Sequence, residues 1–86
     1  MAWTLDKNGV TPSVTLTTAE QDNLNNFMDA VRDGTHPATA GGRLDYKKLA
    51  GTDDQYEIRL SKDNRATFRV DKTNERVTML QVGGHT

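Results

Sequence analysis

Three arginines in the second half of the chain occupy positions from which a β-sheet could gather them on one surface. Arg59 and Arg69 each lie between two apolar residues, and Arg65 opens the segment that contains Arg69. Guanidinium groups gathered in this way can bind phosphate bidentately and stabilise the charge that develops on a transferring phosphoryl group. Arginines on an exposed face more often only solubilise the protein and pair with nearby carboxylates. The carboxylates expected as partners in that case are Glu57, Asp71 and Glu75.

A histidine and two lysines could add acid–base and electrostatic chemistry. His85 follows the Gly83-Gly84 pair, and its imidazole titrates near neutral pH, which suits general acid–base catalysis. The glycines would let the chain turn back over a sheet, although a residue so near the end of a chain is often frayed. Lys47 and Lys48 could contact phosphate or could be ordinary solvated charges.

Signatures of several other kinds of site are missing from the sequence. It contains no cysteine, and neither of its two histidines has an acidic residue at ligand spacing, so we expect no metal site. It contains no Walker-type loop, dinucleotide-binding glycine pattern or serine elbow, so we expect no cofactor and no small-molecule ligand. No apolar run approaches the roughly 18 residues of a membrane helix, and no signal peptide is evident. These features predict a cytoplasmic protein with no membrane contact.

The length of the chain limits its number of domains, and its charge limits its attraction to nucleic acid. At 86 residues with 34% hydrophobic residues, the chain is expected to form a single domain, residues 1–86, with a modest core. The formal net charge of −1 gives no general attraction to nucleic acid. Residues 1–42 carry two basic and five acidic side chains, and residues 43–86 carry nine basic and seven acidic ones. The second half is therefore the more basic, but only mildly.

The strongest local pattern predicts a helix in the first half. Thr17 and Glu20 have the spacing of a capping box. Gly34 is suited to a left-handed cap at the end of the helix, and Pro37 should prevent the helix from restarting. Residues 3–16 are predicted to be extended, and residues 35–43 to form a loop. The apolar stripe of the helix, at i, i+3, i+4 and i+7, consists of Leu24, Phe27, Met28 and Val31.

The second half predicts three strands, at about 55–61, 65–71 and 76–82. Short polar segments at 62–64 and 72–75 suit tight turns, which make neighbouring strands antiparallel. One face of this sheet would be apolar, and the helix stripe is its natural cover. The expected fold is therefore α+β, with one main N-terminal helix packed on a C-terminal antiparallel sheet of three to four strands.

Four ordered motifs resemble the C-terminal half of the RelE/ParE toxin superfamily. They are Lys48-Leu49-Ala50-Gly51, Tyr56-Glu57-Ile58-Arg59-Leu60, Arg65-Ala66-Thr67-Phe68-Arg69-Val70 and Val82-Gly83-Gly84-His85, and the segment they span is about half of the chain. The resemblance implies a RelE/ParE-like fold and a toxin of a toxin–antitoxin, or plasmid-stabilisation, system. It also implies an antitoxin protein as partner, and an endoribonuclease that cleaves messenger RNA on the ribosome by attack of the ribose 2′-hydroxyl.

The resemblance assigns roles by position. Arg59 and Arg65 would hold phosphate, and His85 would act as acid or base. Lys47 and Lys48 would approach the RNA backbone, with Arg69 as a secondary contact. Two alternatives stay open, namely a catalytically inactive or gyrase-directed RelE/ParE-like binding protein, and a small protein-interaction domain whose arginines are merely solvated.

Overall fold

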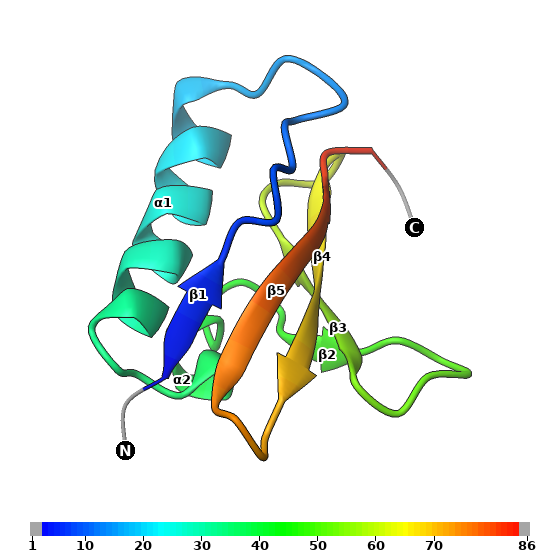
Figure 1. The fold of residues 1–86 in the computed structure, drawn as a ribbon. Helices are drawn as coiled ribbons and strands as arrows, with labels where there is room; N and C mark the ends of the chain where they lie inside the picture. The colour runs from blue at the N-terminus through cyan, green and yellow to red at the C-terminus, as the bar shows by residue number, and fades with distance from the viewer. Residues whose placement is uncertain (1–2, 85–86) are drawn as a thin grey trace.

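The computed structural model describes residues 3–84, which form a mixed sheet with two helices on one side of it (Figure 1). The sheet has five strands in the order β1-β5-β4-β3-β2. In chain order the elements are β1 (Thr4–Asp6), α1 (Thr18–Arg32), α2 (Pro37–Ala40), β2 (Lys47–Lys48), β3 (Gln55–Arg59), β4 (Arg65–Asp71) and β5 (Arg76–Val82). None of the helices in this part of the chain is long and apolar enough to cross a membrane.

The C-terminal strands confirm the predicted hairpins. Strands β3, β4 and β5 pair antiparallel in sequence order, and β2 adds antiparallel to β3. The predicted strands at 65–71 and 76–82 are matched residue for residue, whereas the first strand ends earlier than predicted, at Arg59. A register shift at Thr67 and Phe68 marks a bulge in the β4–β5 pair.

The N-terminal segment corrects the expectation of an antiparallel sheet of three to four strands. Strand β1 lies parallel to β5 at the edge of the sheet, and the Thr4 amide donates to the Glu75 carbonyl at 2.9 Å. Residues 3–16 were expected to be extended, but the only strand among them is β1, and Val14 is exposed. A partner 71 residues away in sequence leaves no local signal, so turn and propensity patterns could not predict this pairing.

Helix α1 begins and ends as the sequence predicts. The Thr17 side chain accepts from the Glu20 amide at 3.1 Å, while the Glu20 carboxylate accepts from the Thr17 amide at 2.8 Å. At the other end Gly34 has a φ of 98°, the left-handed conformation that suits glycine. The whole predicted apolar stripe of the helix is buried against the sheet.

The predicted loop at 35–43 contains the short helix α2. Pro37 was expected to prevent the preceding helix from restarting, and it is instead the first residue of a new one, where its missing amide costs no hydrogen bond. His36 caps this helix, because its Nδ1 accepts from the Ala38 amide at 3.0 Å. The chain then passes close under the sheet at Gly41, where a Cβ atom would lie 2.9 Å from Ile58 Cγ2.

The core lies between α1 and the sheet. Phe27 from the helix and Phe68 from β4 are fully buried, with ring centroids 4.9 Å apart. Strand residues that alternate with the core residues therefore point to the other face of the sheet, away from α1. The core side chains are Trp3, Leu24, Phe27, Met28, Val31, Ile58, Leu60, Ala66, Phe68, Val70, Val77, Met79 and Val82.

Candidate anion-binding face

The face of the sheet turned away from α1 gathers most of the basic residues that the sequence singles out. In the β3–β4 pair Arg59 lies directly opposite Arg65, and Gln55 lies opposite Arg69. Residues directly opposite each other on antiparallel strands project to the same side. The predicted gathering of the arginines on one surface is therefore confirmed. We call this surface the open face, defined by Lys47, Glu57, Arg59, Arg65 and Arg69.

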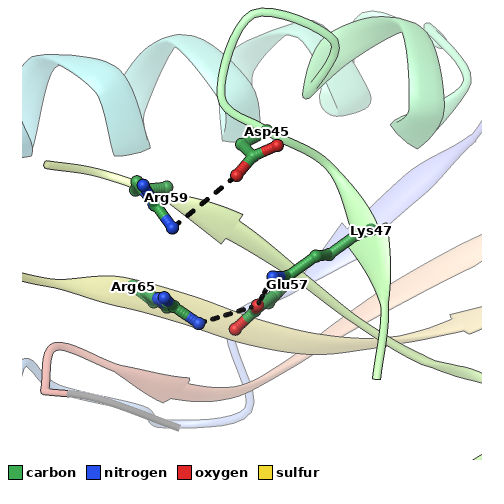
Figure 2. A network of polar contacts seen from close by, with 5 residues as sticks. All are labelled: Asp45, Lys47, Glu57, Arg59 and Arg65. Atoms are coloured by element: carbon green, nitrogen blue, oxygen red, sulfur yellow. Dashed lines mark hydrogen bonds and ion pairs between the residues drawn. The ribbon is translucent and has the colours of Figure 1, made fainter. Parts of the chain in front are cut away.

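A buried carboxylate lies at the centre of the open face. Glu57 is only 2% exposed, although it lies on the polar side of β3. Its Oε1 accepts from Arg65 Nη1 at 3.0 Å and lies 3.3 Å from Lys47 Nζ, as Figure 2 shows. An ionised carboxylate can be buried at modest cost only when it is paired and hydrogen-bonded, as here. Glu57 thus holds two basic side chains from two different strands beside one another.

The two other arginines of the open face form ion pairs near the surface. Arg59 Nη2 lies 3.8 Å from Asp45 Oδ2 (Figure 2), and Arg69 Nε lies 3.2 Å from Asp54 Oδ2. Between 42% and 61% of each of these four side chains is exposed. Such pairs contribute little to stability, about 0–1 kcal/mol, and are readily exchanged for another anion.

The expected carboxylate partners of the arginines are matched only in part. Glu57 does pair with an arginine. Asp71 instead accepts from the side chain and the backbone amide of Asn74 in the β4–β5 turn. These hydrogen bonds, from the Asn74 side chain first, lower the pKa of Asp71 below its usual value. Asp45 and Asp54, which lie outside the strands, were not expected as partners.

A shallow hollow of about 480 Å³ opens beside Glu57. The two predicted lysines do not enter it equivalently, because Lys47 pairs with Glu57 across the strands whereas Lys48 pairs with Tyr56. Only Lys47 therefore projects onto the open face, although Lys48 also lines the hollow. The residues that line the hollow are Lys47, Lys48, Leu49, Ala50, Thr52, Glu57 and Arg65.

Stacked aromatic rings fix the short strand that carries the lysines. The rings of Tyr46 and Tyr56 are nearly parallel, with centroids 5.0 Å apart, and Tyr46 also lies 6.0 Å from Phe68. Burial, with a smaller effect of Tyr56, raises the pKa of Tyr46 to about 12. Tyr46 is therefore a neutral packing residue at physiological pH, and it positions Lys47 next to it in the chain.

The C-terminal glycines lie beside Arg65. The Gly83 amide donates to the Arg65 carbonyl at 2.7 Å, and the Arg65 amide donates to the Gly84 carbonyl at 3.1 Å. His85 lies outside the described residues, so its role stays a prediction. Within residues 3–84 no group of three or more histidine, aspartate or glutamate side chains could hold a metal ion.

Two features of this site were not predicted from the sequence. Glu57 was foreseen only as a possible ion-pair partner and not as the buried centre of the face. Its place in the alternation, two residues before Arg59, was the available signal. Asn64 was taken only as a turn residue, yet its side-chain Oδ1 accepts from the Gly84 amide at 3.0 Å.

The fold of this chain is similar to that of a solved structure. No protein-family model matches the chain, and no curated protein matches it either. Among solved structures, a chain of the archaeal RelE–RelB complex from Pyrococcus horikoshii OT3 superposes with a TM-score of 0.69 at 22% identity. The match covers 98% of this chain and 96% of that chain. The 86-residue chain therefore has a RelE-like fold, as the resemblance of its strand motifs predicts.

Proposed function

We propose that this protein is the toxin-like component of a toxin–antitoxin system, and that it cleaves messenger RNA on the ribosome. The observation that supports this most is the open face, where a RelE-like sheet places Arg59 opposite Arg65, and where Lys47 and Arg65 line a hollow. The similar solved structure is a RelE–RelB complex, which supports an antitoxin as the protein partner. The reaction would take place where ribosomes are, in the cytoplasm.

The proposed chemistry uses the basic residues around the bridging phosphate. In this class of cleavage the ribose 2′-oxygen attacks the adjacent phosphorus, and the 5′-oxygen of the next nucleotide leaves. Arg59 and Arg65 would hold the phosphate and offset the negative charge that grows on its oxygens. His85 would supply or remove the proton as general acid or base. Lys47, Lys48 and Arg69 would contact the RNA backbone on either side.

The ion pairs of the open face are compatible with phosphate binding. The Arg59–Asp45 pair is long and exposed, so a phosphate can replace Asp45 at little cost. At Arg65 a phosphate would compete with the carboxylate of Glu57, which Nη1 contacts at 3.0 Å.

Induced expression in bacteria tests the proposal. The unmodified chain should arrest growth and leave cleaved messenger RNA, and Arg59→Ala, Arg65→Ala and His85→Ala should each relieve both effects. Arg32→Ala is a matched control, since Arg32 pairs with Asp29 on the exposed side of α1, away from the open face. Intact growth and intact messenger RNA on expression of the unmodified chain would refute the ribonuclease function.

A second candidate is a RelE/ParE-like binding protein without ribonuclease activity, directed at an antitoxin or at gyrase. The observation in its favour is that Asp45, Asp54 and Glu57 balance the arginines of the open face, giving a mixed surface that suits a protein partner. Tight binding to such a partner in a pull-down with purified proteins, together with intact RNA in the expression experiment, would favour it. A solvated interaction domain would show neither phosphate binding nor RNA cleavage.

A further inference from the structure

Asn64, in the turn between β3 and β4, connects three parts of the fold that are distant in sequence. Its side-chain Nδ2 donates to Glu20 Oε2 at 2.6 Å, at the start of α1. Its side-chain Oδ1 accepts from the Gly84 amide at 3.0 Å. Its own carbonyl accepts from the Leu60 amide at 2.9 Å and closes the hairpin. One amide side chain thus joins the helix start to the C-terminal glycines.

The Glu20 end of this connection is firmly held. Glu20 is buried, and its Oε1 is already engaged by the Thr17 amide of the capping box. Its Oε2 accepts from Asn64 and also from the Ser61 hydroxyl. A carboxylate can only accept, so the Asn64 side chain must turn its NH₂ group toward Glu20 and its oxygen toward Gly84. The orientation of the amide is therefore set by the contacts of the helix start.

The Gly84 end lies at the edge of the open face. Gly84 is bound by Asn64 through its amide and by the Arg65 amide through its carbonyl. Gly84 has a φ of 77° and Gly83 a φ of 93°, so the chain turns here in a conformation that residues other than glycine rarely adopt. The anchored Gly84 thus fixes the backbone that pairs with Arg65.

We infer that Asn64 is a positioning residue, which through Glu20 and Gly84 fixes the C-terminal glycines against the backbone of Arg65, one of the phosphate-holding residues of the proposed reaction. This inference rests on the proposed function for its catalytic consequence. Its structural part, the anchoring of Gly84 by Asn64, stands without it. The alternative is that Asn64 only stabilises the hairpin turn.

A matched variant separates positioning from stability. Asn23 Nδ2 donates to the Leu60 carbonyl at 2.9 Å, so it joins the same helix to the same hairpin without contacting Gly84. Asn23→Ala and Asn64→Ala each remove a side-chain amide between α1 and the β3–β4 turn. Only Asn64→Ala also removes the acceptor of the Gly84 amide.

The test is amide hydrogen exchange of the full-length chain followed by NMR. In the unmodified protein the Gly84 amide should exchange at least about fivefold more slowly than its intrinsic rate, the factor expected for one ordinary hydrogen bond. Asn64→Ala should abolish this protection, and Asn23→Ala should leave it within about twofold of the unmodified value. Exchange of Gly84 at its intrinsic rate in the unmodified protein overturns the inference even if Asn64→Ala does not fold. Equal loss of protection in both variants overturns it as well.

The catalytic consequence has its own readout. With messenger RNA bound to ribosomes as substrate, Asn64→Ala should lower kcat by about tenfold or more with little change in KM, because misplacing a group that holds the reacting phosphate affects the chemical step more than binding. Asn23→Ala should change neither constant. Absence of cleavage by the unmodified chain refutes the proposed function and leaves the anchoring to be decided by the exchange data. Normal kcat in an Asn64→Ala variant with an unprotected Gly84 refutes the positioning role alone.

Discussion

Replacing Glu57 by glutamine tests whether the open face is organised around a buried charge. The substitution keeps the shape of the side chain and its acceptor oxygen but removes the negative charge that Arg65 and Lys47 share. A glutamine amide also brings an NH₂ group, which cannot accept from either cation. We expect the Glu57→Gln protein to be less stable at pH 7.

The magnitude follows from the exposure of the two partners. Arg65 is 21% exposed, so it cannot recover its hydrogen bond fully from water, and such charge-assisted bonds contribute about 1.5–3 kcal/mol. Lys47 is 51% exposed and can turn its ammonium group into solvent, so its pair adds about 0–1 kcal/mol. We therefore expect a loss of about 2 kcal/mol in the free energy of unfolding. For a domain of this size that is a fall in Tm of roughly 8–16 °C.

Urea denaturation monitored by tryptophan fluorescence measures this loss. Trp3 is the only tryptophan of the chain and is 6% exposed, so unfolding moves it from the core into water. Asp54→Asn is the control, because it neutralises the same charge in a pair whose two side chains are 51% and 50% exposed. That variant should lose less than about 1 kcal/mol. Equal stability of the two variants would refute the assigned role of Glu57.

The same variant should change anion binding in the opposite direction. In the unmodified protein a phosphate near Lys47 and Arg65 must compete with the carboxylate of Glu57. In Glu57→Gln that competitor is neutral, so the increase in Tm on adding inorganic phosphate at constant ionic strength should be larger than in the unmodified protein. A smaller or absent increase would show that Lys47 and Arg65 do not form an anion site.

Three further predictions concern the framework around the site. Phe68→Ala should lower the free energy of unfolding by about 3–5 kcal/mol, measured in urea, because this fully buried ring leaves a large cavity. Gly41→Ala should cost about 1–3 kcal/mol, since its Cβ would lie 2.9 Å from Ile58 Cγ2, whereas Gly42→Ala, with its nearest contact at 3.4 Å, should be tolerated on thermal unfolding. The pKa of Glu20 is lowered to about 2, chiefly by the hydrogen bond from a serine hydroxyl, so its contribution is complete above about pH 4.5 and is lost toward pH 2. The free energy of unfolding in urea should therefore fall more steeply from pH 4.5 to pH 2 in the unmodified protein than in Glu20→Gln. The same pH dependence in both proteins would contradict the role of Glu20.

The parts of the fold that the sequence predicts well are those whose information is local. The capping box of Thr17 and Glu20, the apolar stripe and the cap at Gly34 all lie within one segment, and the structure confirms each of them. Alternation along β3 and β4 likewise placed the arginines on the side opposite the core. Pro37 was misjudged because proline both ends and begins helices, and only the His36 cap reveals which applies.

The parts that escaped prediction depend on contacts between distant segments. Strand β1 pairs with β5 through backbone groups, which carry no residue-specific signal. Asp45, which pairs with Arg59, has a φ of 58°. No pattern in the sequence predicts this local turn of the backbone. Glu57 is buried on a face that alternation marks as polar, because the partners that cover its carboxylate come from two neighbouring strands. Alternation predicts the side to which a residue points, but not what lies over it.

The ion pairs of the open face differ in exposure. The pairs of the buried Glu57 form its centre, and the exposed pairs of Arg59 and Arg69 form its rim. At the centre, Glu57 holds Arg65 and Lys47 by contacts that a solvent anion can displace only by leaving a buried charge unpaired. At the rim, Arg59 and Arg69 pair with exposed aspartates, so a phosphate can replace those aspartates at a cost of only about 0–1 kcal/mol. A polyanion such as RNA would therefore first engage the rim arginines, and its affinity should fall steeply with salt because each phosphate contact releases counterions. Loss of Arg59 or Arg69 should reduce that salt dependence, whereas a protein partner recognised through both signs of charge would be affected far less.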